Sequence, residues 1–271
     1  MSIPADWQTA DGSIRLYRGD CLEVMPELSE TIDAIICDPP FGTTACKWDV
    51  VIPFAPLWKA YKGIVKPNGA IVLFGSQPFT TDIINSNRPM FRYEWIWQKE
   101  RGSNWQLANR QPMKTHENLV VFYASQPTYN PQKIDMERTR YSKPHAWAKA
   151  VPHLAGGGSC KDYHVGGEYV GRFPTSIQPF ARDKQIHNAQ KPVALLKYLI
   201  RTYTNPGETV LDNTFGSGTA AVACINTGRR FIGIERDPGY FDLAVSRLET
   251  ALGNVGLFAD TAPLERRLDH A

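Results

Sequence analysis

Short apolar runs and stretches of helical periodicity alternate along most of the chain. Apolar runs of strand length lie at residues 34–37, 70–74, 93–97, 119–123, 209–211 and 231–234. Stretches with the helical period lie at 54–65, 79–86, 192–203, 219–227 and 240–248. Strands that alternate with helices are typical of a mostly parallel sheet with helices on both faces. The pattern therefore predicts an α/β fold whose elements fall into two blocks.

The periodicity fails between these blocks, over residues 126–185. This segment contains two glycine runs, several prolines and many aromatic residues. We therefore expect a first half of one domain at 1–125, an insertion at 126–185 and the second half of the domain at 186–258. The polar and charged residues 259–271 are expected to form a tail.

The insertion carries more positive charge than the whole chain, whose formal net charge is +3. It contains nine basic and five acidic residues, interleaved with aromatic side chains. Basic and aromatic residues together suit a nucleic-acid surface, and a solvated loop is the alternative. The basic residues that we expect to contact a nucleic acid include Arg138, Arg140, Lys143, Lys149 and Arg172. The histidines and the cysteine of this segment fit no standard metal-ligand spacing, so no metal site is predicted.

The remaining bulk features favour a soluble protein. The five cysteines are odd in number and include no Cys-x-x-Cys pair, which favours reduced thiols in the cytosol. The N-terminus lacks a basic start followed by an apolar stretch, and no window reaches the roughly 18 consecutive apolar residues of a membrane span. We therefore expect a cytoplasmic protein with no membrane partner.

The apolar run 34–37 ends abruptly in Asp38, Pro39, Pro40 and Phe41. Consecutive prolines hold the chain extended, and because Pro40 has no N–H, the carbonyl of Pro39 has no neighbouring donor. An amino group could donate hydrogen bonds to that carbonyl and to Asp38 together. An ordinary Pro-Pro loop after a strand is the alternative.

A glycine-rich turn follows the run 209–211. Residues 212–219 read Asp-Asn-Thr-Phe-Gly-Ser-Gly-Thr, and glycines allow the backbone to approach a ligand closely. The next strand ends in Glu235, about 20 residues on, where a doubly wound fold places the acid that holds a ribose diol. The turn lacks the third glycine of a dinucleotide motif, and no lysine follows Gly218, so a nucleoside fits better than NAD or ATP. As alternatives, Asp212 could cap the turn and Glu235 could be a solvated strand end.

In this order, the motifs resemble those of the amino-group-specific DNA methyltransferases of the beta class, which use S-adenosylmethionine. The tetrapeptide 38–41 resembles the catalytic motif, residues 213–219 resemble the methionine-binding glycine loop, and residues 233–237 resemble the ribose-binding strand end. Residues 187–192 are similar to the segment beside the methionine end of the cofactor, and residues 19–21 to the segment that approaches its adenine. The resemblance implies a Rossmann-like methyltransferase sheet, with the insertion in the place of the target-recognition region.

The resemblance implies S-adenosylmethionine as the cofactor, double-stranded DNA as the partner and no metal. The catalytic residues are then expected to be Asp38, Pro39, Pro40 and Phe41. The expected cofactor-binding residues are Asp20, Cys21, Asp38, Lys191, Asp212, Asn213, Phe215, Gly216, Ser217, Gly218, Thr219, Glu235 and Arg236. For Lys191, a place on the surface is the alternative. Asn213-Thr214 stands where Pro-Phe is usual in the family, and Phe41 replaces the commoner tyrosine. Many relatives form dimers, so a homodimer is a further expectation.

The mechanism implied by the resemblance begins with an exocyclic amino group, whose lone pair is delocalised into the base. Hydrogen bonds to Asp38 and to the carbonyl of Pro39 would localise that pair, after the nucleotide has left the duplex and stacked on Phe41. Within the family, an initial aspartate favours adenine N6. The alternatives are cytosine N4, an RNA or protein amide, and a nucleic-acid-binding module without catalysis. The cell would be bacterial or phage-infected.

Overall fold

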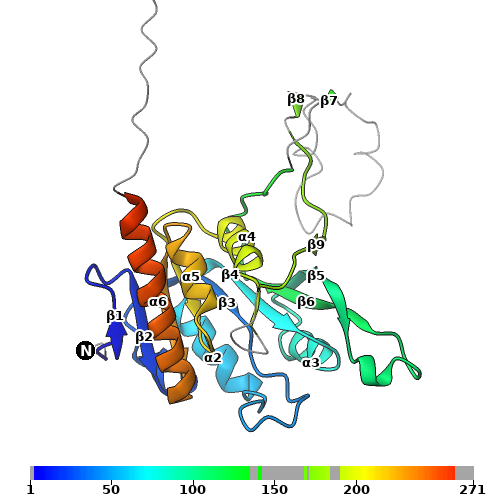
Figure 1. Ribbon diagram of the computed structural model, residues 1–271, viewed down its shortest axis with the longest axis horizontal. Helices are drawn as coiled ribbons and strands as arrows, with labels where there is room; N and C mark the ends of the chain where they lie inside the picture. The colour runs from blue at the N-terminus through cyan, green and yellow to red at the C-terminus, as the bar shows by residue number, and fades with distance from the viewer. Residues whose placement is uncertain (1–2, 135–139, 142–167, 170, 184–189, 260–271) are drawn as a thin grey trace, which may run out of the picture. The chain divides into compact units, whose positions relative to one another are not determined.

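Nine strands form one sheet in the described part of the computed structural model, which comprises residues 3–134, 140–141, 168–169, 171–183 and 190–259 (Figure 1). The strand order is β1-β2-β11-β10-β3-β4-β6-β5-β9. The bounds are β1 Trp7–Gln8, β2 Ile14–Arg18, β3 Ile32–Cys37, β4 Val65–Gly75, β5 Phe91–Ser103, β6 Lys114–Phe122, β9 Ile177–Pro179, β10 Thr209–Asp212 and β11 Arg230–Glu235. From β2 to β4 the neighbours are parallel, whereas β6 runs antiparallel to both β4 and β5. The predicted α/β sheet is therefore confirmed, with an antiparallel part at one side.

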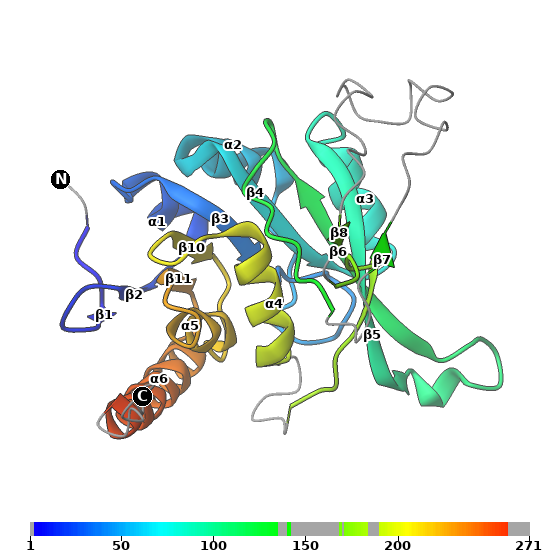
Figure 2. The same ribbon diagram turned by 90° about the horizontal axis from the view of Figure 1, so that it is seen from above.

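Helices cover both faces of this sheet, as predicted (Figure 2). One face carries α1 Cys21–Val24, the 3-10 turn η1 Met25–Glu27, α2 Phe54–Ile64 and α3 Phe79–Ser86. The other carries α4 Val193–Tyr203, α5 Thr219–Ile225 and α6 Pro238–Ala259. Successive residues of a strand point to opposite faces, so Ile35 packs with the first set of helices and Ile36 with the second. No helix in the described part of the chain has the length and apolar character of a membrane span.

The structure adds elements that the apolar pattern does not predict. Strand β2 pairs in parallel with β11, but Arg15 and Arg18 interrupt its apolar run. Helix α6 continues through Gly253 to Ala259, well beyond the predicted end at 248. The predicted helices otherwise begin and end within two residues of their expected bounds.

The chain forms two compact units, Met1–Asn130 with Ser176–Ala271 and, separately, Pro131–Thr175. In the second unit, β7 Arg140–Tyr141 pairs antiparallel with β8 Glu168–Tyr169. Both ends of the segment 126–185 belong to the first unit. The backbone N–H of Asn130 donates to the carbonyl of Thr202 at the end of α4, at 2.7 Å, and β9 extends the main sheet beside β5.

Gly233 allows the glycine-rich turn to pack closely against the sheet. It lies in β11, opposite Asp212 of β10. A Cβ at this position would lie 2.5 Å from Cδ1 of Phe215 and 2.6 Å from Cε1 of Phe231. Phe215 belongs to the turn and is buried, so the missing side chain of Gly233 allows the turn to sit against the strand.

We expect Gly233→Ala to lower the free energy of unfolding by about 1–3 kcal/mol, because the added methyl group overpacks a buried contact. Gly63→Ala is the matched control: a Cβ at this exposed position of α2 meets no atom within 4 Å, and alanine favours a helix. The control is expected to be neutral or slightly stabilising. Urea unfolding of both variants measures the difference, and equal stabilities would contradict the packing argument.

Candidate active site

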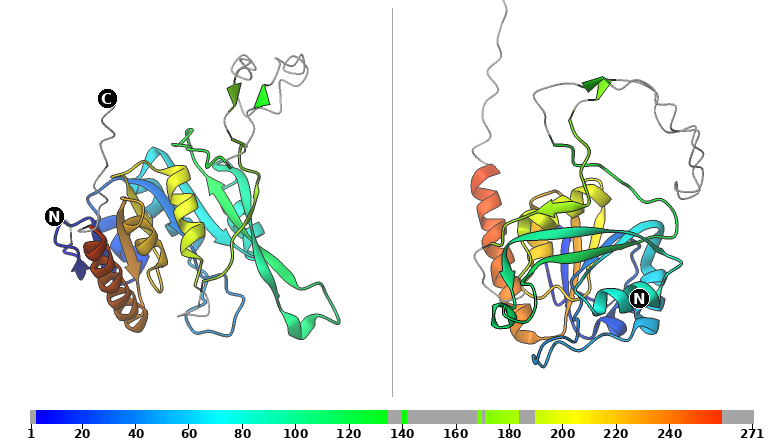
Figure 3. Two further views of the ribbon diagram at one scale, coloured as in Figure 1. Left: turned by 45° about the horizontal axis from the view of Figure 1, so that its top comes forward. Right: turned by 90° about the vertical axis from the view of Figure 1, so that its right-hand side faces the viewer.

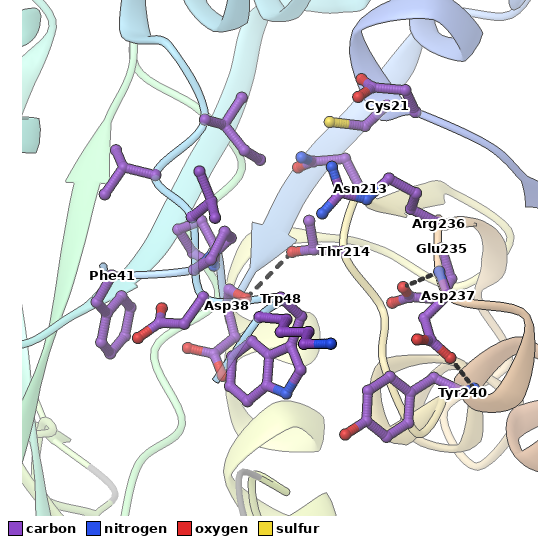
Figure 4. A pocket seen from close by; sticks show the side chains of 18 of the residues that line it. Cys21, Asp38, Phe41, Trp48, Asn213, Thr214, Glu235, Arg236, Asp237 and Tyr240 are labelled. Carbon is purple, nitrogen blue, oxygen red and sulfur yellow. Dashed lines mark hydrogen bonds between the residues drawn. The ribbon is translucent and has the colours of Figure 1, made fainter. Parts of the chain in front are cut away.

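A pocket of about 600 Å³ opens at the carboxyl ends of the parallel strands (Figure 4). Ligands of open α/β sheets bind at this edge. The predicted site residues that line it are Asp20 and Cys21 after β2, Asp38, Pro39, Pro40 and Phe41 after β3, Lys191 before α4, Asn213 after β10, and Glu235 and Arg236 at the end of β11. The fold therefore brings motifs from both halves of the sequence into one cavity.

A smaller cavity of about 60 Å³ adjoins the first, and Asp38 and Lys191 line both. Its other predicted lining residues are Asp212, Phe215, Gly216, Ser217 and Thr219. Gly218 lines neither cavity. It precedes α5 with a φ of 76°, and a Cβ there would lie 3.0 Å from Cβ of Ala244 in α6. Gly218 therefore allows the backbone of the turn to adopt a left-handed conformation and to pack closely on α6.

Thr214 joins the acidic tetrapeptide to the glycine-rich turn. Its hydroxyl donates to the backbone carbonyl of Asp38 at 3.1 Å, and its N–H donates to Oδ1 of Asp212 at 3.1 Å. One residue thus fixes the distance between the two motifs. We did not predict a role for Thr214, because its partner at Asp38 is far away in the sequence.

The two carboxylate oxygens of Asp38 have different surroundings. Oδ2 lies 2.7 Å from Nζ of Lys191, whereas Oδ1 is buried and has no hydrogen-bond partner in the structure. Burial raises the pKa of Asp38 to about 6, the ammonium of Lys191 lowers it, and Glu117 raises it. Asp38 therefore has a free acceptor in the pocket and a cation that favours its charged form.

Lys191 lies between two carboxylates. Its side chain is only 11% exposed, so the alternative of a surface lysine is wrong. Nζ lies 2.7 Å from Asp38 and 3.1 Å from Oε2 of Glu117, and Glu117 is held in turn by Lys99 at 2.5 Å. Burial alone would lower the pKa of Lys191, but the two carboxylates raise it above its usual range.

Glu117 and Lys99 are site residues that the sequence analysis missed. They lie on β6 and β5, which pair antiparallel, with Glu117 opposite Trp97. Burial raises the pKa of Glu117, but Lys191 and Lys99 hold it below its usual range. The predicted strand 119–123 stopped short of Glu117, so no pattern in the sequence indicated that a charge in this strand reaches the pocket.

The carboxylate of Asp212 and the amide of Asn213 lie deep in the site. Burial raises the pKa of Asp212 to about 7, although the N–H of Thr214 lowers it. Oδ1 of Asn213 accepts a hydrogen bond from the hydroxyl of Tyr61 in α2 at 2.6 Å, and its Nδ2 is buried without a partner. Asn213 is therefore anchored by its carbonyl oxygen and presents an unused donor.

Glu235 supports the glycine-rich turn from the neighbouring strand. One carboxylate oxygen accepts the N–H of Gly216 at 2.9 Å, and the other accepts the N–H of Asp237 at 2.8 Å. Its pKa is raised, with burial as the largest cause. Each carboxylate oxygen can accept a second hydrogen bond, so Glu235 can still bind hydroxyl groups in the pocket.

A loop at residues 42–53 forms one wall of the pocket. Asp49 is buried and accepts backbone N–H groups of Gly42 at 2.8 Å, Thr43 at 2.9 Å and Thr44 at 2.7 Å. The same loop carries Trp48, which lies between Asp38 and Tyr240 in Figure 4. No motif predicted this wall.

The residues expected to contact nucleic acid are only partly described. Arg172 is exposed, and its backbone forms an isolated antiparallel β-bridge with Ile134 in the second unit. Arg140 lies in β7. Arg138, Lys143 and Lys149 lie outside the described residues. Their role stays a prediction.

Comparison with known proteins identifies the class. The family model described as DNA methylase, for N6 and N4 methyltransferases, matches residues 32–246, which include the acidic Pro-Pro motif and the glycine-rich turn of this pocket. The chain belongs to this family and is a DNA methyltransferase.

Individual relatives agree with this assignment. The type II methyltransferase M.HpaI of Haemophilus parainfluenzae is 25% identical over 257 residues, which cover 87% of this chain and 74% of that protein. The crystal structure of the M1.HpyAVI–SAM complex matches with a TM-score of 0.58 and 26% identity, covering 86% of this chain and 99% of that one. The cytosine-N4-specific PvuII DNA methyltransferase has the same fold, with a TM-score of 0.63, 15% identity and coverage of 89% and 90%.

The raised pKa of Asp212 predicts that stability depends on pH. Because the folded pKa of about 7 exceeds the unfolded value of about 3.9, the folded state binds the proton more tightly, and stability falls as the pH rises from 4 through 7. Asp212→Asn removes the buried charge. We expect the variant to exceed the wild type by about 2–4 kcal/mol at pH 8, with little difference near pH 4.

Urea unfolding at pH 4, 6 and 8 measures this dependence. Asp242→Asn is the control, because it makes the same substitution at an exposed position of α6, away from the pocket. A stability difference for Asp212→Asn that is equal at pH 4 and pH 8 would contradict the assignment.

Proposed function

We propose that this chain transfers a methyl group from S-adenosylmethionine to N6 of an adenine that is flipped out of duplex DNA. The observation that carries the proposal is the buried Oδ1 of Asp38, an acceptor without a partner at the edge of the pocket. It belongs to a tetrapeptide whose backbone carbonyl at Pro39 precedes a residue with no N–H. Two acceptors on consecutive residues suit the two hydrogens of an exocyclic amino group.

The residues of the pocket fit S-adenosylmethionine. Glu235 offers carboxylate oxygens to ribose hydroxyls, and Asn213 offers an amide donor that is buried and unused. Asp212 offers a carboxylate whose pKa burial raises to about 7, which a ligand ammonium would stabilise in its charged form. M1.HpyAVI, which is 26% identical, has been crystallised as a complex with this molecule. When bound, the cofactor supplies an electrophilic methyl group.

The tetrapeptide would act by orienting the amino group. Asp38 and the carbonyl of Pro39 accept its two hydrogens, which turns the nitrogen lone pair away from the ring system and toward the methyl donor. Asp38 must be charged to accept in this way, and Lys191 at 2.7 Å favours that charge. The carboxylate is also the nearest acceptor for the proton that the nitrogen releases after methylation.

Phe41 is the proposed stacking partner of the flipped base. It is partly exposed and lines the pocket, while its ring stacks on Phe79 with centroids 5.1 Å apart. Phe79 is buried and thus holds the ring of Phe41 in place. Extrusion of the base is required because the amino group cannot reach Asp38 from inside a duplex.

The choice of adenine rests on the resemblance, in which an initial aspartate favours N6. Methylation of cytosine N4 uses the same two acceptors and is the second candidate. A PvuII enzyme of the same fold is described as cytosine-N4-specific. We place the reaction in the cytoplasm of a bacterial cell, because the relative M.HpaI comes from a bacterium.

We expect Asp38→Ala to abolish methyl transfer while S-adenosylmethionine still binds, because the acceptor for the amino group is lost and the ribose contacts remain. The measurement uses unmethylated duplex DNA and labelled cofactor, with nucleosides identified by mass spectrometry. N6-methyladenine from the wild type supports the proposal. N4-methylcytosine would show that the substrate is cytosine and not adenine. Turnover by Asp38→Ala at the wild-type rate would show that methyl transfer does not take place at Asp38.

We expect Lys191→Met to move the acid limb of the pH–rate profile to higher pH by about one pH unit or more, because Asp38 loses the cation that lowers its pKa. Lys99→Met removes a cation that contacts Glu117 instead, so its shift should be smaller and in the same direction. An acid limb that stays in place in active Lys191→Met would show that Lys191 does not control the charge of Asp38.

A further inference from the structure

The β5–β6 hairpin projects beyond the sheet on the side of the pocket. Strand β5 has 13 residues, whereas β3 has 6. Across the sheet, Cys37 at the end of β3 is level with Glu94 of β5, so the carboxyl half of β5 and the amino half of β6 continue past the edge at which Asp38 lies. Figures 1 and 3 show this green hairpin and the blue loop 42–53 on the same side of the sheet. The hairpin is thus a natural flank of the active site.

The hairpin is continuous with the residues that line the pocket. Glu117 lines the pocket from β6, and Lys114, three residues earlier, donates to the hydroxyl of Ser76 after β4. The ladder continues from the pair Trp97 and Glu117 to the pair Ser103 and Lys114. At about 3.3 Å per residue this is roughly 10–20 Å, the height of about three to six stacked base pairs at 3.4 Å each. A duplex that delivers a base to Asp38 would therefore extend over the hairpin.

The end of the hairpin is exposed and carries apolar side chains that nothing in the described structure covers. Residues 104–113 are all exposed. Trp105 is 72% exposed, Leu107 42% and Met113 47%. Trp105 begins the 3-10 turn η2 Trp105–Leu107, directly after Asn104 at a φ of 65°. Asn104 is the one non-glycine residue with positive φ among the described residues, so the turn holds Trp105 outward at a backbone cost.

The charge of the hairpin is positive. Arg101 and Arg110 are exposed and Lys114 is partly exposed, and Glu100 is the one acidic residue between positions 100 and 114. Glu100 is already engaged, because it accepts the backbone N–H of Arg182 at 3.1 Å and lies 3.6 Å from Nε of the same residue. The exposed tip also contains Asn104, Gln106, Asn109 and Gln111, whose amides can pair with base edges.

We propose that the β5–β6 hairpin contacts the DNA duplex beside the target base, a role that the sequence analysis gave to the insertion alone. Arg101 and Arg110 bind phosphates, and Trp105 lies against a base or sugar. This inference rests on the proposed function. A second copy of the chain fits the exposed hairpin less well than DNA does, because two hairpins of the same positive charge would repel each other at a two-fold axis.

The test measures the affinity of the full chain for a 40-base-pair duplex of mixed sequence, by fluorescence anisotropy at several salt concentrations. We expect the double variant Arg101→Gln, Arg110→Gln to lower the slope of log K against log salt by about 1.8, since each lost phosphate contact contributes about 0.9. Trp105→Ala should weaken binding about tenfold at constant slope. In both variants, the affinity for S-adenosylmethionine should remain at the wild-type value.

The double variant Lys59→Gln, Lys62→Gln is the matched control. It removes the same charge from exposed positions of α2 and should leave the salt slope unchanged. If the wild type neither binds nor methylates duplex DNA, the proposed function fails. If the wild type binds and the hairpin variants keep its affinity and slope, the hairpin proposal fails alone. It also fails if sedimentation shows a dimer that Trp105→Ala dissociates.

Discussion

A single buried ammonium connects the parallel and antiparallel parts of this fold. Nζ of Lys191 lies within 3.1 Å of both Asp38, at the end of β3, and Glu117, in β6. Two carboxylates this close to each other would be costly to ionise together in a buried site, and the cation between them compensates for both. Lys99 balances the second carboxylate, so the four charges form a neutral set. The position of Asp38, and with it the active-site tetrapeptide, therefore depends on strands and a helix that lie far apart in the sequence.

The glycine-rich turn depends on a comparable set of cross-connections. Thr214 fixes the turn to Asp38, Glu235 accepts the N–H of Gly216, and Gly233 leaves space for Phe215. These contacts join the turn to two strands, to the end of β3 through Asp38 and to β11 through Gly233 and Glu235. A small displacement of one strand would consequently move the turn and the tetrapeptide together, which is how a rigid sheet can hold two reactants in register.

The sequence predicted the motifs at the carboxyl ends of β3, β10 and β11 because parallel strands present those ends along one edge. It did not predict Glu117, because the antiparallel strand β6 reaches the same edge with its amino half. Lys99 was missed because it lies in β5 beyond the predicted apolar run 93–97. Nor did it predict the anchor of Asn213, since Tyr61 lies on a helix 152 residues away in the sequence. Asp49 was missed for a different reason. Its three acceptor contacts are to backbone N–H groups, which leave no pattern in the side chains.

The two aspartates of the site have the same chemistry but different electrostatic surroundings. Burial raises the pKa of both, to about 6 for Asp38 and to about 7 for Asp212. Asp38 has the ammonium of Lys191, whereas no ion pair of Asp212 occurs within the described part of the chain. A carboxylate that is buried without a cation gains most from a ligand that brings one. Asp212 would therefore gain more from a ligand ammonium than Asp38, which already has its cation and keeps Oδ1 without a protein partner. The difference in local charge is thus consistent with the two roles proposed above, a cofactor contact for Asp212 and a substrate contact for Asp38, at the ends of neighbouring strands.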